Sequence, residues 1–97
     1  MNYNINDFLN EINIVIYEVE EELLDRQKGV PGEGSIKQLE SIKSELEKIR
    51  NQAQNNVLPP KDKRYTAFSR CVVDEWNFNS VLGAKLCDLA EKYKSKI

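Results

Sequence analysis

Residues able to take part in catalysis are few and are confined to the C-terminal half: Cys71, Cys87, Asp74 and Glu75. A reactive cysteine usually has a positive neighbour that lowers the pKa of its thiol. Arg70 adjoins Cys71, but adjacent residues on a helix point about 100° apart. The chain has no His, so a His-based general base and the common zinc ligand sets are missing. We therefore expect no enzymatic activity, no metal and no cofactor.

A row of carboxylates occupies one side of the N-terminal segment. Its members are related by steps of three and four residues, so they share one face of a helix: Glu18, Glu21, Glu22 and Asp25. One interpretation is a solvated face whose charge is relieved by lysines from the last helix. The other is a partner-binding ridge that docks a basic protein, such as a nuclease, with fast and salt-sensitive association.

Basic residues gather between positions 61 and 70, close to Tyr65: Lys61, Lys63, Arg64 and Arg70. Such a group could follow a phosphate backbone, but Asp62 and Asp74 offset it locally and the whole chain has a net charge of −2. The expected helices also lack the basic polar face of a recognition helix. We do not expect nucleic acid to be the main partner.

Length and composition favour a single helical domain over residues 1–97. The chain is 40% hydrophobic and 31% charged, enough apolar surface to offset the ordering entropy of one core. No apolar run reaches the length of a membrane span, and the first residues lack the pattern of a secretion signal, so we expect a cytoplasmic protein with no membrane partner. In that compartment Cys71 and Cys87 are expected as core thiols, with a disulfide as the alternative.

Charge is distributed unevenly along the chain. Residues 1–28 carry a net charge of −5, residues 29–56 are neutral, and residues 57–97 carry +3. This asymmetry could hold the first and last helices together, or it could steer a charged partner.

Two amphipathic helices are predicted in the first half. Apolar residues recur every three or four positions in a first stripe (Ile5, Leu9, Ile12, Ile16, Val19, Leu23) and in a second (Leu39, Ile42, Leu46, Ile49, Ala53). The first helix should begin after an N-cap at Asn6 and end before the glycine-rich segment 29–34. The second should begin at Ser35, with Gln38 completing a capping box. The short connection predicts antiparallel packing.

Two further helices are predicted in the second half. Pro60 is placed at the first turn of the third, and one face of that helix should carry Tyr65, Phe68, Val72 and Trp76. Residues 77–80 interrupt the pattern, and a fourth helix follows with a stripe of Leu82, Leu86, Leu89 and Tyr93. Gly83 within it predicts close approach by a neighbouring helix. The fold class expected is all-α, a four-helix up-and-down bundle.

The C-terminal half contains three short sequence patterns: LPPK at 58–61, RCVVDEW at 70–76 and SVLGAKL at 80–86. Through them, this half resembles small bacterial immunity proteins that accompany polymorphic or contact-dependent toxins. The resemblance implies a non-enzymatic protein that binds one cognate toxin domain in the producing cell and blocks it, often by covering the active site. Because such proteins are often acidic where their toxins are basic, the ridge of Glu18, Glu21, Glu22 and Asp25 is the first interface candidate.

Two other functions remain open. The apolar stripe of the first helix resembles a heptad pattern and could pair with a second copy, giving a homodimeric interaction module. A small regulator that binds nucleic acid is the other alternative.

Overall fold

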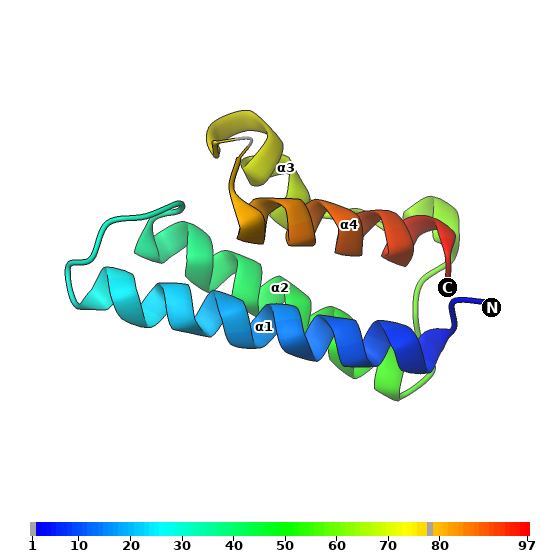
Figure 1. Cartoon of the computed structure of the whole chain (residues 1–97). Helices are drawn as coiled ribbons and strands as arrows, with labels where there is room; N and C mark the ends of the chain where they lie inside the picture. Colours follow the sequence, from blue (N-terminus) through cyan, green and yellow to red (C-terminus); the bar gives the residue numbers. More distant parts are fainter. Residues whose placement is uncertain (1, 78) are drawn as a thin grey trace.

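The computed structural model of the chain describes residues 2–77 and 79–97, apart from the side chain of Cys71. Four α-helices and one 3-10 turn, and no β-strand, are present in these residues. They are α1 (Ile5–Gln27), α2 (Ile36–Gln54), η1 (Lys61–Lys63), α3 (Ala67–Glu75) and α4 (Val81–Ser95). Successive α-helices run in opposite directions (Figure 1), so the predicted all-α, four-helix up-and-down bundle is confirmed.

The helices are arranged so that neighbours in the sequence are also neighbours in space. α1 contacts α2 and α4, and α3 contacts the same two helices from the other side. α1 and α3 are therefore diagonal to each other across the bundle. Figure 1 shows the two long helices, α1 and α2, lying side by side. One side of α1 consequently faces the core, and the opposite side faces solvent.

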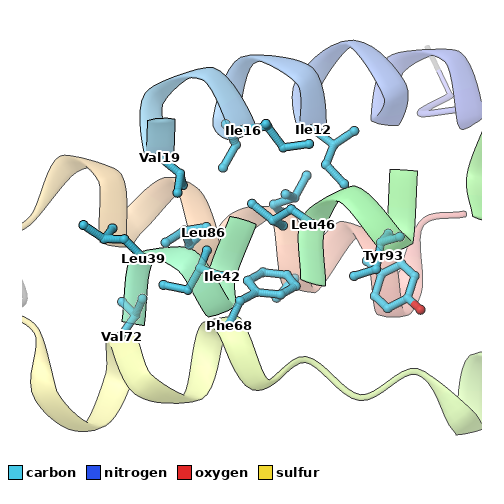
Figure 2. Close-up of a cluster of buried hydrophobic side chains, with 14 of the residues drawn as sticks. Ile12, Ile16, Val19, Leu39, Ile42, Leu46, Phe68, Val72, Leu86 and Tyr93 are labelled. Carbon is cyan, nitrogen blue, oxygen red and sulfur yellow. The ribbon is translucent and has the colours of Figure 1, made fainter. Parts of the chain in front are cut away.

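The core is built from apolar side chains of all four α-helices, many of which Figure 2 shows pointing toward one another. The buried face of α1 is wider than the predicted stripe, of which Ile12, Ile16, Val19 and Leu23 are buried. Phe8 and Val15, which lie one step beside the stripe, are almost fully buried at 0% and 2% exposure. Ile5 and Leu9, expected within it, are only partly buried. The inner face of α1 is therefore fully occupied by the core of its own chain.

The start of α1 differs from the prediction. The N-cap is Asn4, and the assignment of Asn6 was wrong. The Asn4 side chain accepts a hydrogen bond from the Asp7 N–H at 3.0 Å, and the Asp7 carboxylate accepts one from the Asn4 N–H at 3.1 Å. This reciprocal pair is a capping box in which Asp replaces Glu or Gln. Asn6 has the apolar Leu9 three positions later, so it has no such partner.

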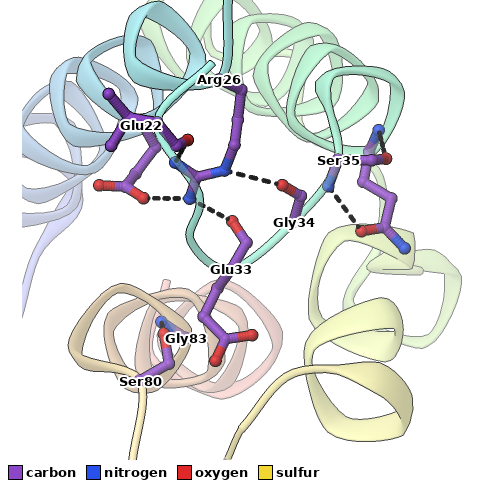
Figure 3. Close-up of polar contacts among 9 residues, drawn as sticks. Glu22, Arg26, Glu33, Gly34, Ser35, Ser80 and Gly83 are labelled. Carbon is purple, nitrogen blue, oxygen red and sulfur yellow. Dashed lines mark hydrogen bonds and ion pairs between the residues drawn. The ribbon is translucent and has the colours of Figure 1, made fainter.

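One guanidinium holds the connection between α1 and α2. Arg26 Nη2 lies 2.5 Å from the Glu22 carboxylate. The same side chain donates to the main-chain oxygens of Glu33 at 2.8 Å and Gly34 at 3.0 Å (Figure 3). It also donates to the main-chain oxygen of Val30 at 3.2 Å. These bonds satisfy carbonyl groups of a loop that has no regular structure to pair them.

α2 begins as predicted. The Ser35 side chain accepts from the Gln38 N–H at 3.1 Å, and the Gln38 side chain accepts from the Ser35 N–H at 3.2 Å (Figure 3). The predicted capping box is confirmed, and α2 packs antiparallel against α1.

The third helix starts later than predicted. η1 follows Pro60, Arg64 is extended, and α3 starts only at Ala67, so the prediction of a helix from Pro60 was wrong. Tyr65 precedes the helix and is 78% exposed, so its placement on the apolar face was wrong too. The other members of that face are buried as predicted: Phe68, Val72 and Trp76.

Two long-range polar contacts account for this late start. Arg64 is buried and donates to the main-chain oxygens of Pro59 at 2.8 Å and Tyr93 at 2.7 Å. Its guanidinium also lies 5.2 Å from the centre of the Tyr93 ring, a cation–π contact. Glu45 of α2 accepts a hydrogen bond from the Ala67 N–H at 3.0 Å and so caps α3 from another helix. These contacts position α3 against α2 and α4.

The fourth helix agrees with its predicted pattern. Leu86, Leu89 and Tyr93 are buried and Leu82 is partly buried. A Cβ added at Gly83 would lie 3.0 Å from Val72 Cγ1 of α3, which confirms the predicted close approach. Phe78, within the predicted interruption at 77–80, lies outside the described residues.

Gly34→Ala should destabilise the fold more than Gly29→Ala. Both glycines have positive φ, +84° and +85°, so alanine at either should lose about 1 to 2 kcal/mol through backbone strain. Only at Gly34 would the added Cβ meet a neighbour, Trp76 Cζ2 at 2.7 Å, and overpacking should add about 1 to 3 kcal/mol there. Urea unfolding of the two variants measures the difference. Equal losses would show that the Trp76 contact yields without cost.

Glu45→Gln should change how stability depends on pH. Burial raises the pKa of the Glu45 carboxyl above its ordinary value, against the opposing effect of hydrogen bonds from the backbone N–H groups of Ala67 and Phe68. A carboxyl with a raised folded-state pKa favours folding at pH below its ordinary pKa, and this contribution is lost as pH rises through the folded-state pKa.

The variant should therefore gain stability relative to the parent chain as pH rises from about 4, the ordinary carboxyl pKa, through the raised folded-state pKa, as followed by urea unfolding. Glu40→Gln, on the exposed side of α2, removes the same charge and is the control. A relative loss of stability for Glu45→Gln over this range would mean that the carboxylate is more stabilising as a cap than it is costly to bury.

Candidate functional site

The predicted ridge lies on α1, and two of its four carboxylates already have cationic partners. Glu18 Oε1 lies 2.5 Å from Lys85 Nζ of α4. Glu22 is paired with Arg26, which holds the α1–α2 loop. The second oxygen of Glu18 is buried and has no hydrogen-bond partner among the described residues. The structural interpretation of the ridge, relief by lysines of the last helix, therefore holds at Glu18.

The other two members of the ridge, Glu21 and Asp25, differ from this pair. Glu21 is exposed and Asp25 is partly exposed. Neither forms an ion pair with any residue that the structure describes. On the opposite flank of α1, Glu20 lies 3.2 Å from Lys43 of α2. The uncompensated negative charge of this region is thus concentrated at Glu21 and Asp25.

The charge asymmetry of the chain has a structural component. Lys85 joins α4 to Glu18, and Lys92 joins it to Glu11 at 2.8 Å. Lys92 also lies 2.9 Å from Asp88 and 5.1 Å from the centre of the Tyr3 ring. Ion pairs between the acidic first helix and the basic last helix therefore neutralise part of the charge of each helix.

A tyrosine is associated with the free carboxylate of the ridge. Glu21 raises the pKa of the Tyr17 phenol above its ordinary value, first through a hydrogen bond and second through its charge. The phenol therefore stays protonated at neutral pH and can act as a donor. Its ring is 61% exposed, so Tyr17 presents a large amphipathic surface to solvent.

An apolar stripe on the outward side of α1 was missed by the sequence analysis. Ile14, Tyr17 and Leu24 are exposed by 58%, 61% and 49%. Together with Glu21 they follow steps of three, four and three residues, so they form one line on the helix opposite its buried face. We call these four residues the outward stripe. The same periodicity was available in the sequence, but the stronger inner stripe took precedence over it.

A shallow hollow of about 230 Å³ lies beside the outward stripe, between α1 and the start of α4. Its lining combines carboxylates with apolar side chains: Glu18, Glu21, Glu22, Val81 and Leu82. Val81 is 71% exposed, so apolar surface extends from α1 toward α4.

The residues considered for catalysis do not converge where their side chains are described. Asp74 and Glu75 are exposed on α3, and Glu75 accepts a hydrogen bond from the Gln38 side chain. Cys87 is a partly buried free thiol on α4 that packs against the core. The side chain of Cys71 lies outside the described structure, so its predicted role as a core thiol stays a prediction. Within residues 2–77 and 79–97, no group of three or more metal-binding side chains is arranged around a common point.

The basic segment 61–70 is divided by the fold. Arg64 is buried, and its guanidinium is bound to carbonyl oxygens and to the Tyr93 ring. Arg70 lies with Tyr65 and Lys94 around a surface hollow of about 580 Å³. Arg70 and Asp74, which could pair on the surface of α3, form no ion pair in the described structure. The basic residues thus do not act as one continuous track.

Comparisons of the chain with protein-family models, with curated protein sequences and with solved structures gave no match. None of the helices in the described residues combines the length and the apolar character that a membrane span requires.

Glu18→Lys and Glu21→Lys should differ in stability although both reverse one charge on α1. The first change places an ammonium beside Lys85 and should lower the free energy of unfolding by about 1 kcal/mol, the upper end for a partly exposed pair. The second breaks no ion pair, only an exposed hydrogen bond with Tyr17, and should change the free energy of unfolding by less than about 0.5 kcal/mol. Urea unfolding at low and high salt measures the free energy of unfolding of both variants. The difference between the two variants should become smaller at high salt. The reverse order would mean that Glu21, rather than Glu18, is held by the fold.

Proposed function

We propose that this protein is an immunity protein that binds a cognate bacterial toxin domain in the cytoplasm and neutralises it by stoichiometric inhibition. The resemblance of the C-terminal half supports this class of function. The observation that carries the proposal is the outward side of α1, where exposed apolar side chains stand beside carboxylates that have no cationic partner among the described residues. An apolar centre with a charged rim is the usual anatomy of a protein–protein interface.

Inhibition of this kind requires only a stable surface and no reacting groups. The inner side of α1 is packed against α2 and α4, so the outward side is presented by a helix already fixed in position. Binding of that side across the active site of a toxin would exclude the substrate. Carboxylates at Glu21 and Asp25 would speed the encounter with a basic toxin, such as a nuclease, and make the association rate depend on salt. Glu18 and Glu22 contribute less to this steering because Lys85 and Arg26 neutralise them.

Self-association is less well supported in the form suggested by the heptad pattern. That form requires the inner stripe of α1, but Ile12, Ile16 and Val19 are at most 4% exposed within the chain itself. A homodimer would have to use the outward side instead. Nucleic-acid binding would have to proceed without Arg64, whose guanidinium is engaged in the fold.

The double variant Glu21→Lys, Asp25→Lys should bind the co-encoded toxin domain more weakly. The association rate constant should fall about tenfold at low salt, with a smaller fall at high salt, because the steering charge has been reversed. The matched control is Glu40→Lys, Asp74→Lys, which reverses one exposed Glu and one exposed Asp on α2 and α3. Surface plasmon resonance gives the rate constants, and inhibition of the toxin's activity gives the stoichiometry.

The proposal predicts a 1:1 complex of the parent chain with the toxin, and inhibition that is complete at one equivalent. A parent chain that neither binds the co-encoded toxin nor reduces its activity would overturn it. If the parent chain binds the toxin but the association rate constant falls equally in both double variants, the acidic side of α1 is not the docking face.

A further inference from the structure

The outward stripe of α1 is unusual for a surface that serves only to meet water. Its apolar members lie on one line, and Ile14 and Leu24 are separated by about 15 Å at 1.5 Å per residue. Single exposed apolar residues are normal on protein surfaces, but an aligned series on one helix marks a contact surface. The core does not require these side chains, because the buried face of α1 lies on the opposite side.

Carboxylates flank the outward stripe on both sides. On the side of α4 stands Glu18, with Asp25 two turns further along the same flank. On the side of α2 stands Glu20, which reaches Lys43. Glu21 lies within the stripe and interacts with the Tyr17 phenol. Because Glu18 and Glu20 are paired with Lys85 and Lys43, the net negative charge of this surface comes from Glu21 within the apolar line and Asp25 beside it.

We propose that the outward stripe is the hydrophobic centre of the interface and enters an apolar cleft on the toxin domain whose rim carries Lys and Arg side chains. This inference rests on the proposed function and names the chemistry of its partner. A helix is convex, so its side chains spread apart and are buried best by a groove that encloses them. Tyr17 is the central anchor because its ring is large and its few rotatable bonds make it inexpensive to order. Basic rim residues of the cleft would complement Glu21 and Asp25.

A second copy of the chain is a poorer occupant of this surface. Two outward stripes packed face to face would bring the unpaired carboxylates of Glu21 and Asp25 of both copies into one interface. Like charges in contact oppose association, and no basic residue of α1 lies within the stripe to compensate. Charge complementarity therefore selects a basic partner over self-association.

Photocrosslinking of the full chain to the purified co-encoded toxin domain tests this placement. Tyr17 is replaced by the photoreactive residue p-benzoylphenylalanine, and Val73, which is 72% exposed on the diagonal helix α3, is replaced in the control. Irradiation should give a 1:1 covalent adduct from position 17 and none from position 73. Peptide mass spectrometry should locate the adduct in a toxin segment that combines apolar residues with Lys or Arg.

The double variant Tyr17→Ser, Leu24→Ser provides the matching affinity measurement. Removal of two apolar anchors should raise the dissociation rate constant about 100-fold while leaving the salt dependence of association intact. Val57→Ser, Val73→Ser removes two apolar side chains with 62% and 72% exposure elsewhere and is the control. Because all four positions are exposed, circular dichroism and thermal unfolding should show that both variants keep the fold.

The outcomes separate this inference from the function on which it rests. The parent chain could bind and inhibit the toxin while position 17 gives no adduct and the Tyr17→Ser, Leu24→Ser variant dissociates at the parental rate. The outward stripe would then not be the interface, and the proposed function would stand. If the parent does not bind the toxin, both are overturned. A concentration-dependent adduct between two copies through position 17, formed without toxin, would overturn the choice of occupant.

Discussion

The structure depends on the burial of one side of α1 between α2 and α4. Phe8, Ile12 and Val19 are fully buried there, and they belong to one core cluster with apolar residues of the facing helices. Packing on this side holds α1 in place and buries its inner apolar residues within the chain itself. The same packing leaves the opposite side of α1 as a fixed, outward-facing surface, and the proposed interface is a consequence of that geometry.

Charged side chains serve this arrangement in two distinct ways. Arg26 binds main-chain carbonyl groups of the α1–α2 connection, and Arg64 binds those of Pro59 in the α2–α3 connection and of Tyr93 in α4. Lys85 ties α4 to α1 through Glu18. Glu21 has no such duty in the described structure, so its charge is available to a partner. Residue type alone would have grouped Glu18 with Glu21, whereas their surroundings give them different roles.

Features that depend on nearby residues could be read from the sequence. The inner stripes of α1 and α2, the Ser35 cap and the packing role of Gly83 all follow from periodicity or from residues a few positions apart. The start of α3 could not be read in this way, because it is set by Glu45 and Arg64 acting across the bundle. At the site, the four ridge residues were found from spacing, but the pairing of Glu18 with Lys85 of α4 depends on the fold. The exposed apolar stripe has the same periodicity as the inner one, and only the fold shows which of the two is buried.

The central claim is that the outward side of α1 meets a toxin domain while the rest of the bundle serves as its support. Amide NMR spectra of the chain, recorded during titration with the co-encoded toxin domain, test it most directly. The account predicts resonance changes between Asn10 and Lys28 that saturate at one equivalent, with α3 little affected. Changes confined to α3 and the segment around Tyr65, or no changes at saturating toxin, would contradict it.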